Sequence, residues 1–210
     1  MSQRTPASPL YRNHAMLTQK STRHLGFLAL AATMAVTRLG QCASASSLPD
    51  ASWAVFFIAG VYFATDWRWA LPALLVQAIG IDFAAIHYYG FSDYCATAAY
   101  WFIVPAYSLL WLGGAWFSRD YQAVSRDLGR LAIRFMLSVS GCFLLTEGSF
   151  YWLNDRIMHA SISGWWANVT SWYGYFTLAT AGYVALAVLG HLAATRYRHA
   201  RAPANAMRVA

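Results

Sequence analysis

Residues 69–88, WALPALLVQAIGIDFAAIHY, decide the fold class of this chain. Asp82 is the only acidic or permanently charged side chain in the stretch. About 20 consecutive apolar residues suffice for a helix to cross the hydrocarbon core of a bilayer. Five further apolar stretches lie before and after it, the one immediately before being short. They cover residues 25–41, 53–65, 97–117, 131–153 and 169–195. The sequence therefore predicts an all-α, polytopic membrane protein with six transmembrane helices.

The composition favours a membrane environment over water. Of the 210 residues, 59% are hydrophobic and only 11% are charged, whereas a soluble domain carries about 25% charged residues. The net charge of +7 does not indicate a nucleic-acid partner, because the basic residues lie at the ends of the apolar stretches instead of in one patch. We therefore expect membrane lipid to surround the protein.

Lysines and arginines are concentrated in every second polar segment, as is typical of segments that face the cytoplasm. The polar segments between those hold only Arg156, and Arg38, near the outer end of the first apolar stretch, is the other exception. This pattern places both termini inside, with a polar tail over residues 1–24, a transmembrane domain over 25–195 and a basic tail over 196–210. The first stretch also resembles a cleavable signal peptide. Its removal would leave five crossings, so we favour a retained helix.

Two acidic residues lie inside apolar stretches. Asp82 and Glu147 are each about six residues from the predicted outer end of their helix, which places both roughly 9 Å below the outer surface. Charged groups at such depth are costly and usually functional, so we expect the two to line one outward-facing cavity. The alternative is that each bonds to a neighbouring helix and only fixes packing.

Cys95 lies where the predicted outer loop meets the fourth apolar stretch. Its neighbours in the sequence are polar and aromatic residues. A helix N-terminus favours the thiolate form of cysteine, and a thiolate is a soft ligand for a transition metal. His87 and Tyr94 precede this cysteine, and Tyr100 follows it. The alternative is that Cys95 is a small, inert hydrophobe, as most lone cysteines are. The other two cysteines have no comparable neighbours, and we interpret them as packing residues.

The first apolar stretch carries small residues at Ala31 and Ala35. Small residues four positions apart allow another helix to approach closely within a membrane. This face of the first helix is therefore a candidate docking surface.

Six predicted helices, inside termini, a short chain and no GxxxxGK[ST] phosphate loop together resemble the substrate-binding (S) components of energy-coupling-factor (ECF) transporters. Within that group, Cys95, with Asp82 in the preceding helix and Tyr100 just downstream, is similar to the pattern of the BtuM family. These are solitary S-component-like proteins of Gram-negative bacteria linked to vitamin B12 uptake. The resemblance covers residues 25–195, and it implies an S-component-like fold in the bacterial inner membrane with cobalamin as the transported ligand.

The resemblance also implies a mechanism. The Cys95 thiolate would ligate the cobalt of cobalamin axially, displace the vitamin's own base and labilise a cyanide on the opposite face. Asp82 and Tyr100 would bind the amide rim of the corrin. Further candidate ligand-binding residues are His87, Tyr94 and Glu147.

Relatives in this group dock on a membrane partner driven by ATPases. In this chain, Ala31 and Ala35 would contact such an energising module. The other possibility is that the protein acts alone, as a solitary member.

Three other functions remain open. An S-component-like binder of another vitamin would form no cobalt–sulfur bond. A membrane enzyme with Cys95 as nucleophile and His87 or Asp93 as its partner would be trapped by electrophiles. A structural subunit without a ligand would be affected by mutation of Asp82 only in its folding.

Overall fold

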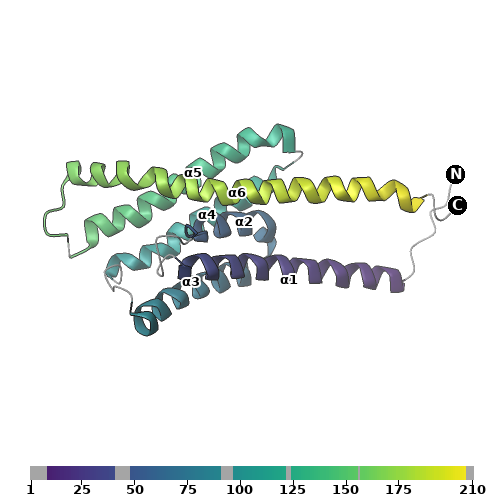
Figure 1. Ribbon diagram of the computed structural model, residues 1–210, viewed down its shortest axis with the longest axis horizontal. Helices are drawn as coiled ribbons and strands as arrows, with labels where there is room; N and C mark the ends of the chain where they lie inside the picture. The colour runs from purple at the N-terminus through teal and green to yellow at the C-terminus, as the bar shows by residue number, and fades with distance from the viewer. Residues whose placement is uncertain (1–8, 41–47, 91–96, 122–123, 156, 207–210) are drawn as a thin grey trace.

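The computed structural model describes residues 9–40, 48–90, 97–121, 124–155 and 157–206. Within these residues the regular structure is entirely helical, which confirms the predicted all-α class (Figure 1). The 3-10 helices η1 (Ala64–Asp66) and η3 (Ala98–Phe102) lead directly into α3 and α4. The α-helices are α1 (Pro9–Gly40), α2 (Ser52–Phe63), α3 (Trp67–Tyr89), α4 (Ile103–Arg119), α5 (Val124–Leu153) and α6 (Ile162–Ala206).

Four helical segments of the described chain are long and apolar enough to cross a membrane. The first of them, Ser52–Tyr89, contains both α2 and α3. With 12 residues, α2 rises only about 18 Å, whereas the hydrocarbon core is about 30 Å thick. The segments are Ser52–Tyr89, Ala98–Arg119, Asp127–Leu153 and Ile162–Tyr197. These lengths support a membrane protein, and the six separate crossings remain a prediction.

Each predicted apolar stretch coincides with one α-helix, but several helices are longer than the stretch. The first helix begins at Pro9, within the predicted polar tail, and α6 continues to Ala206, within the predicted basic tail. Arginine and lysine are good helix formers, so a helix can continue past its apolar part into solvent. Apolarity therefore marks the candidate membrane-spanning part of each helix and underestimates the length of the helix.

Successive helices run in opposite directions. Arg38, near the end of α1, contacts Ser52 at the start of α2, and Arg23, earlier in α1, contacts Tyr62 near the end of α2. Figure 1 shows the same reversal between α5 and α6. This alternation is compatible with the charge pattern, and the topology remains a prediction.

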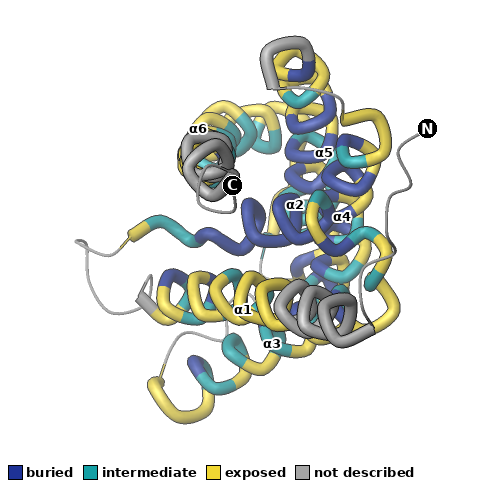
Figure 2. The backbone as a smooth tube through the Cα atoms, turned by 90° about the vertical axis from the view of Figure 1, so that its right-hand side faces the viewer, coloured by how far each residue is buried: buried dark blue, intermediate teal, exposed yellow. Residues whose placement is uncertain are grey.

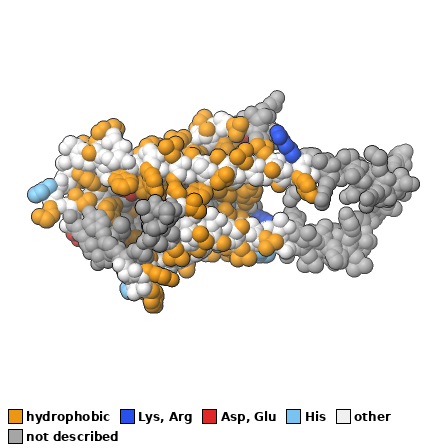
Figure 3. Space-filling view, viewed as in Figure 1, with side chains coloured by type: hydrophobic (Ala, Val, Ile, Leu, Met, Phe, Trp, Pro, Cys, Tyr) orange, Lys and Arg blue, Asp and Glu red, His pale blue; other side chains and the backbone are white. Residues whose placement is uncertain are grey.

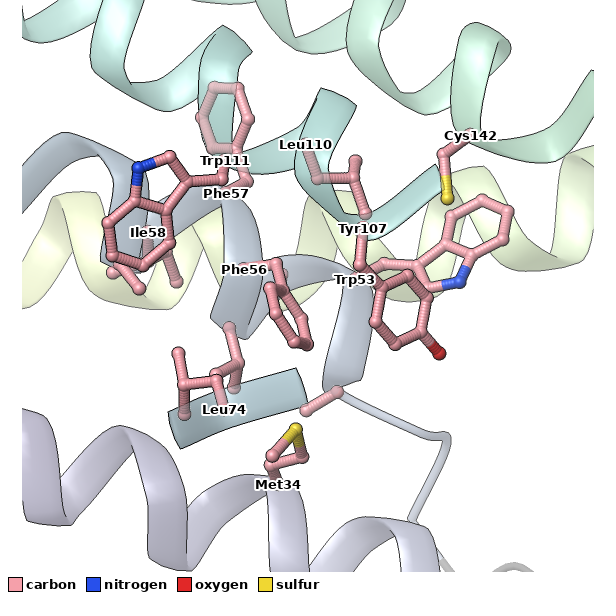
Figure 4. Close-up of a cluster of buried hydrophobic side chains, with 14 of the residues drawn as sticks. Met34, Trp53, Phe56, Phe57, Ile58, Leu74, Tyr107, Leu110, Trp111 and Cys142 are labelled. Carbon is pink, nitrogen blue, oxygen red and sulfur yellow. The ribbon is translucent and has the colours of Figure 1, made fainter. Parts of the chain in front are cut away.

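The centre of the bundle is formed by α2 and α4 (Figure 2). Ten of the twelve residues of α2 are buried, so this helix contacts other helices instead of lipid. Aromatic and aliphatic side chains from α1 to α5 converge around it (Figure 4). Because its surroundings are protein, α2 does not need the length of a lipid-spanning helix.

Two glycines set the distance between α2 and α4. A Cβ atom at Gly60 would collide with the backbone carbonyl of Trp111, and one at Gly114 would collide with the backbone carbonyl of Phe57. Close backbone approach at glycine is a common way for membrane helices to pack. Neither residue can be enlarged unless the two helices separate.

On the face of the bundle shown in Figure 3, the described surface carries many hydrophobic side chains and few charged ones. Large apolar side chains are exposed along several helices, including Val76, Leu137, Leu178 and Leu186. Of the candidate spans, the one in α6 is the least buried inside the protein. An apolar surface of this extent is typical of contact with lipid.

Candidate ligand-binding site

Asp82 of α3 is held by Arg38 of α1. Arg38 Nε donates a hydrogen bond of 2.6 Å to Asp82 Oδ1, and Nη2 donates one of 2.5 Å to Oδ2. This two-point pairing matches the planar geometry of guanidinium and carboxylate. The two side chains are 12% and 25% exposed, so the pair is protected from screening by solvent. It fixes α1 against α3 near the ends of both helices.

Tyr100 binds the same carboxylate. Its hydroxyl donates a hydrogen bond of 2.8 Å to Asp82 Oδ2. Tyr100 lies in η3, whose backbone begins after Thr97 with a hydrogen bond of 2.9 Å from the Tyr100 N–H to the Thr97 carbonyl. The bond to Asp82 therefore joins the start of the fourth apolar stretch to α3.

The remaining nitrogen of Arg38 binds groups just before α2, at the start of α2 and on α4. Nη1 donates to Asp50 Oδ2 at 3.1 Å, to Ser52 Oγ at 2.9 Å and to the Tyr107 hydroxyl at 3.0 Å. Asp50 also accepts a hydrogen bond of 2.9 Å from the backbone N–H of Ser52. The first N–H groups of a helix have no partner within the helix, so this bond satisfies one of them at the start of α2. These residues, with Asp82 and Tyr100, form the Arg38 cluster, which joins α1, α2, α3, η3 and α4.

The Arg38 cluster contains two carboxylates and one guanidinium, so its formal charge is −1. An ionised carboxylate has about four positions that accept hydrogen bonds. Within the described residues, Oδ1 of Asp82 accepts one bond and Oδ2 accepts two. One acceptor position on Oδ1 is therefore unused by the described protein. Charge and acceptor capacity both favour a ligand that presents N–H donors.

Several predicted site residues lie elsewhere. Cys95 and Tyr94, and the alternative partner Asp93, fall outside the described residues. His87 is on the exposed side of α3, where its Nδ1 lies 3.0 Å from the carbonyl oxygen of Phe83. Among the described residues, no hydrogen bond or ion pair joins His87 to the Arg38 cluster.

Glu147 belongs to a different pair of helices. It lies on α5 and accepts a hydrogen bond of 3.5 Å from Asn168 Nδ2 of α6. The described contacts do not join it to Asp82. The structure thus brings together Asp82 and Tyr100 of the predicted set, while Glu147 contacts the α6 side of the bundle.

The predicted docking residues on α1 are half-buried. Ala31 packs against the core, and its carbonyl oxygen accepts a hydrogen bond of 2.7 Å from Gln77 Nε2 of α3. Ala35 is also half-buried, whereas Leu28 and Val36 are exposed. The exposed positions beside Ala31 and Ala35 thus include the small residues Ala29 and Ala32 as well as larger ones, and docking of a partner there remains a prediction.

Sequence reasoning missed the residue at the centre of the cluster. Arg38 attracted notice only as an exception to the charge pattern, and Asp50, Ser52 and Tyr107 attracted none. A usable signal was present, because opposite charges at similar depth in two apolar helices are expected to pair. Arg38 and Asp82 are both near the predicted outer ends of their helices, so their pairing was predictable.

The hydroxyl of Tyr100 provides a direct test of the cluster. Tyr100→Phe is expected to lower the free energy of unfolding by about 1.5 kcal/mol, since it removes a hydrogen bond to a charged acceptor. Tyr88→Phe is the matched control, because Tyr88 is 79% exposed, and its effect should stay within about 0.5 kcal/mol. Denaturation in detergent, followed by circular dichroism, measures both, and equal effects would contradict the assigned geometry.

The chain was compared with known proteins. No protein-family model matches it, and no curated protein matches it. The functional assignment therefore depends on the residues of the site.

Proposed function

We propose that this chain binds cobalamin and carries it across the bacterial inner membrane. The observation that supports this most directly is the pairing of Tyr100 with Asp82. These two residues, together with Cys95, form the pattern that resembles the BtuM family. A hydrogen bond between residues 18 positions apart is not required by chain connectivity, so it supports their acting in one site.

Cys95 supplies the ligand to the metal in this proposal. Its thiolate donates an electron pair to cobalt(III), and the vitamin's own base leaves that axial position with its electron pair. A strong thiolate donor weakens the bond to cyanide on the opposite face. Cyanide then leaves with its bonding pair and takes a proton from water, so the cobalt oxidation state does not change.

The Arg38 cluster holds the periphery of the ligand. The corrin rim carries primary amides, whose N–H groups suit the unused acceptor position on Asp82. Arg38 and Tyr100 keep that carboxylate oriented, which reduces the ordering cost when the ligand binds. Glu147, next to Asn168, offers a second acceptor on the α5–α6 side.

The proposed topology has six crossings with both termini in the cytoplasm. The alternating helix directions and the four long apolar segments support it. In this topology the Arg38 cluster lies at the periplasmic end, where cobalamin would enter. Passage to the cytoplasm would use either an ECF-type energising module docked at the α1 face containing Ala31 and Ala35, or the protein alone.

An absorption spectrum tests the proposal. The full chain is purified in detergent, incubated with cyanocobalamin and separated from excess ligand. The expected result is a retained corrin spectrum that is shifted in the wild type and returns to the free form in Cys95→Ala. Cys142→Ala is the matched control, because Cys142 is a buried thiol on α5, and its spectrum should equal that of the wild type.

Two outcomes of this experiment would contradict the proposal. A colourless wild-type protein would exclude cobalamin and favour another vitamin. A retained but identical spectrum in the wild type and Cys95→Ala would exclude ligation of cobalt by this thiolate.

A further inference from the structure

A cavity of about 290 Å³ lies at the opposite end of the bundle from the Arg38 cluster, among α2, α4, α5 and α6. Its walls are mainly apolar and include Phe57, Val61, Leu131 and Val188. Of the residues predicted to bind cobalamin, those that the structure describes, Asp82, His87, Tyr100 and Glu147, do not line it. The cavity is far too small for a corrin, and its walls suit a hydrocarbon chain.

The rim of this cavity is polar. The Tyr62 hydroxyl lies 3.0 Å from His191 Nδ1, so this contact joins α2 to α6 at the edge of the cavity. The ring of Tyr121 lies 6.2 Å from the ring of His191, with the two planes nearly perpendicular. Aromatic residues with a polar tip are typical of the interface between hydrocarbon and headgroups.

A cationic recess adjoins the cavity, and Tyr121 lines both. Three arginines, Arg119, Arg130 and Arg134, line the recess together with one carboxylate, Asp120. Arg134 is committed to protein contacts, since it donates 2.5 Å and 2.7 Å hydrogen bonds to Asp120 Oδ2 and to the Trp116 carbonyl oxygen. The other two arginines determine what else the recess can bind.

Arg119 and Arg130 are both available to an anion. Arg119 is exposed and forms no ion pair within the described part of the chain. Arg130 is also exposed, and its one ion pair with a described residue is a long contact of 3.5 Å with Asp127. Among the described residues here, the three arginines together with Asp120 and Asp127 carry a formal charge of +1. A phosphodiester would neutralise it.

The recess lies at the ends of two candidate spans. One of them ends at Arg119 and the next begins at Asp127. Residues at span ends lie at headgroup level, and the adjoining cavity extends into the hydrocarbon region. The charge pattern places this end of the bundle on the cytoplasmic side, where basic pockets between helices bind anionic headgroups.

We propose that the recess and cavity together bind one anionic phospholipid. Its phosphate lies between Arg119 and Arg130, and an acyl chain occupies the cavity beneath Tyr121. The lipid fills the space between α6 and the rest of the bundle, where α6 has few protein contacts. This site is independent of the cobalamin proposal.

Native mass spectrometry of the full chain tests the site. The protein is titrated with phosphatidylglycerol or with phosphatidylcholine of identical acyl chains. The wild type is expected to bind the first phosphatidylglycerol more tightly than phosphatidylcholine. Arg119→Gln combined with Arg130→Gln should weaken phosphatidylglycerol binding about tenfold or more, and phosphatidylcholine binding should not change.

The matched control replaces two arginines that lie at the same end of the bundle but outside the recess. Arg68→Gln combined with Arg196→Gln makes the same change in net charge, and both residues are exposed. This variant should bind phosphatidylglycerol as the wild type does. Replacing Arg119 and Arg130 with lysine retains the charge and should preserve most of the preference, which separates loss of charge from misfolding.

Three results would overturn the proposal. The wild type could bind both lipids equally, the recess variant could retain its preference for phosphatidylglycerol, or the control variant could lose as much affinity as the recess variant. The last result would indicate general surface charge instead of a site. Because no step involves cobalamin, failure here leaves the proposed transport function intact.

Discussion

Replacing Arg38 with methionine is expected to lower the free energy of unfolding by about 3–5 kcal/mol. The side chain of Arg38 is only 12% exposed, and its guanidinium forms ion pairs with both Asp82 and Asp50. Methionine keeps most of the volume but leaves two carboxylates without their cation in a poorly hydrated place. For a chain of this size, that loss corresponds to a decrease in apparent Tm of roughly 6–20 °C, which thermal denaturation in detergent can measure.

A second variant separates the charge from the packing. Asp82→Asn introduced into Arg38→Met removes one of the unpaired carboxylates, so the double variant should be more stable than Arg38→Met alone. Arg23→Met is the surface control. Its pair with Asp66 measures 2.6 Å, but the two side chains are 45% and 31% exposed, so its removal should cost no more than about 1 kcal/mol. Similar losses in Arg23→Met and Arg38→Met would contradict the central position of Arg38.

Gly114→Ala is expected to destabilise the protein by about 2–3 kcal/mol, although alanine is the better helix former. The added Cβ would collide with the backbone carbonyl of Phe57. A backbone group cannot rotate away as a flexible side chain can, so α2 and α4 must separate. The loss can be measured by the same thermal denaturation.

Gly182→Ala is the matched control for this substitution. A Cβ at Gly182, in α6, would meet no atom within 4 Å. The change should therefore leave stability the same or raise it by up to about 1 kcal/mol. If Gly114→Ala were as harmless as Gly182→Ala, the close crossing of α2 and α4 would be wrong.

The helices were predictable because apolarity over many residues is a strong signal. Each of the six apolar stretches contains or overlaps one α-helix. The helix ends were less predictable, since α5 begins at Val124 although its apolar part begins at residue 131. The polar first turns there contribute no hydropathy signal, yet their residues are compatible with a helix.

The site was predictable only in part, because charge pairing depends on how helices are arranged. Asp82 and Tyr100 emerged from the sequence because of their unusual position and their resemblance to a known pattern. Asp50 could not be assigned, since a carboxylate in a predicted loop is ordinarily solvated. Only the packing of α1 against α2 brings it within 3.1 Å of Arg38 Nη1.

The burial of α2 also constrains the order in which the protein is assembled. This helix leaves the ribosome before α4, whose Trp111 and Gly114 cover it in the finished bundle. The residues from Ala64 to Arg119 take roughly 3–11 s to synthesise at about 5–20 residues per second. During that interval a helix too short to cross the membrane alone has to be kept in place by α1, α3 or the insertion machinery. We therefore expect the stable placement of α2 to depend on the synthesis of α4, and we expect truncated chains that end before α4 to be substrates for quality-control proteolysis.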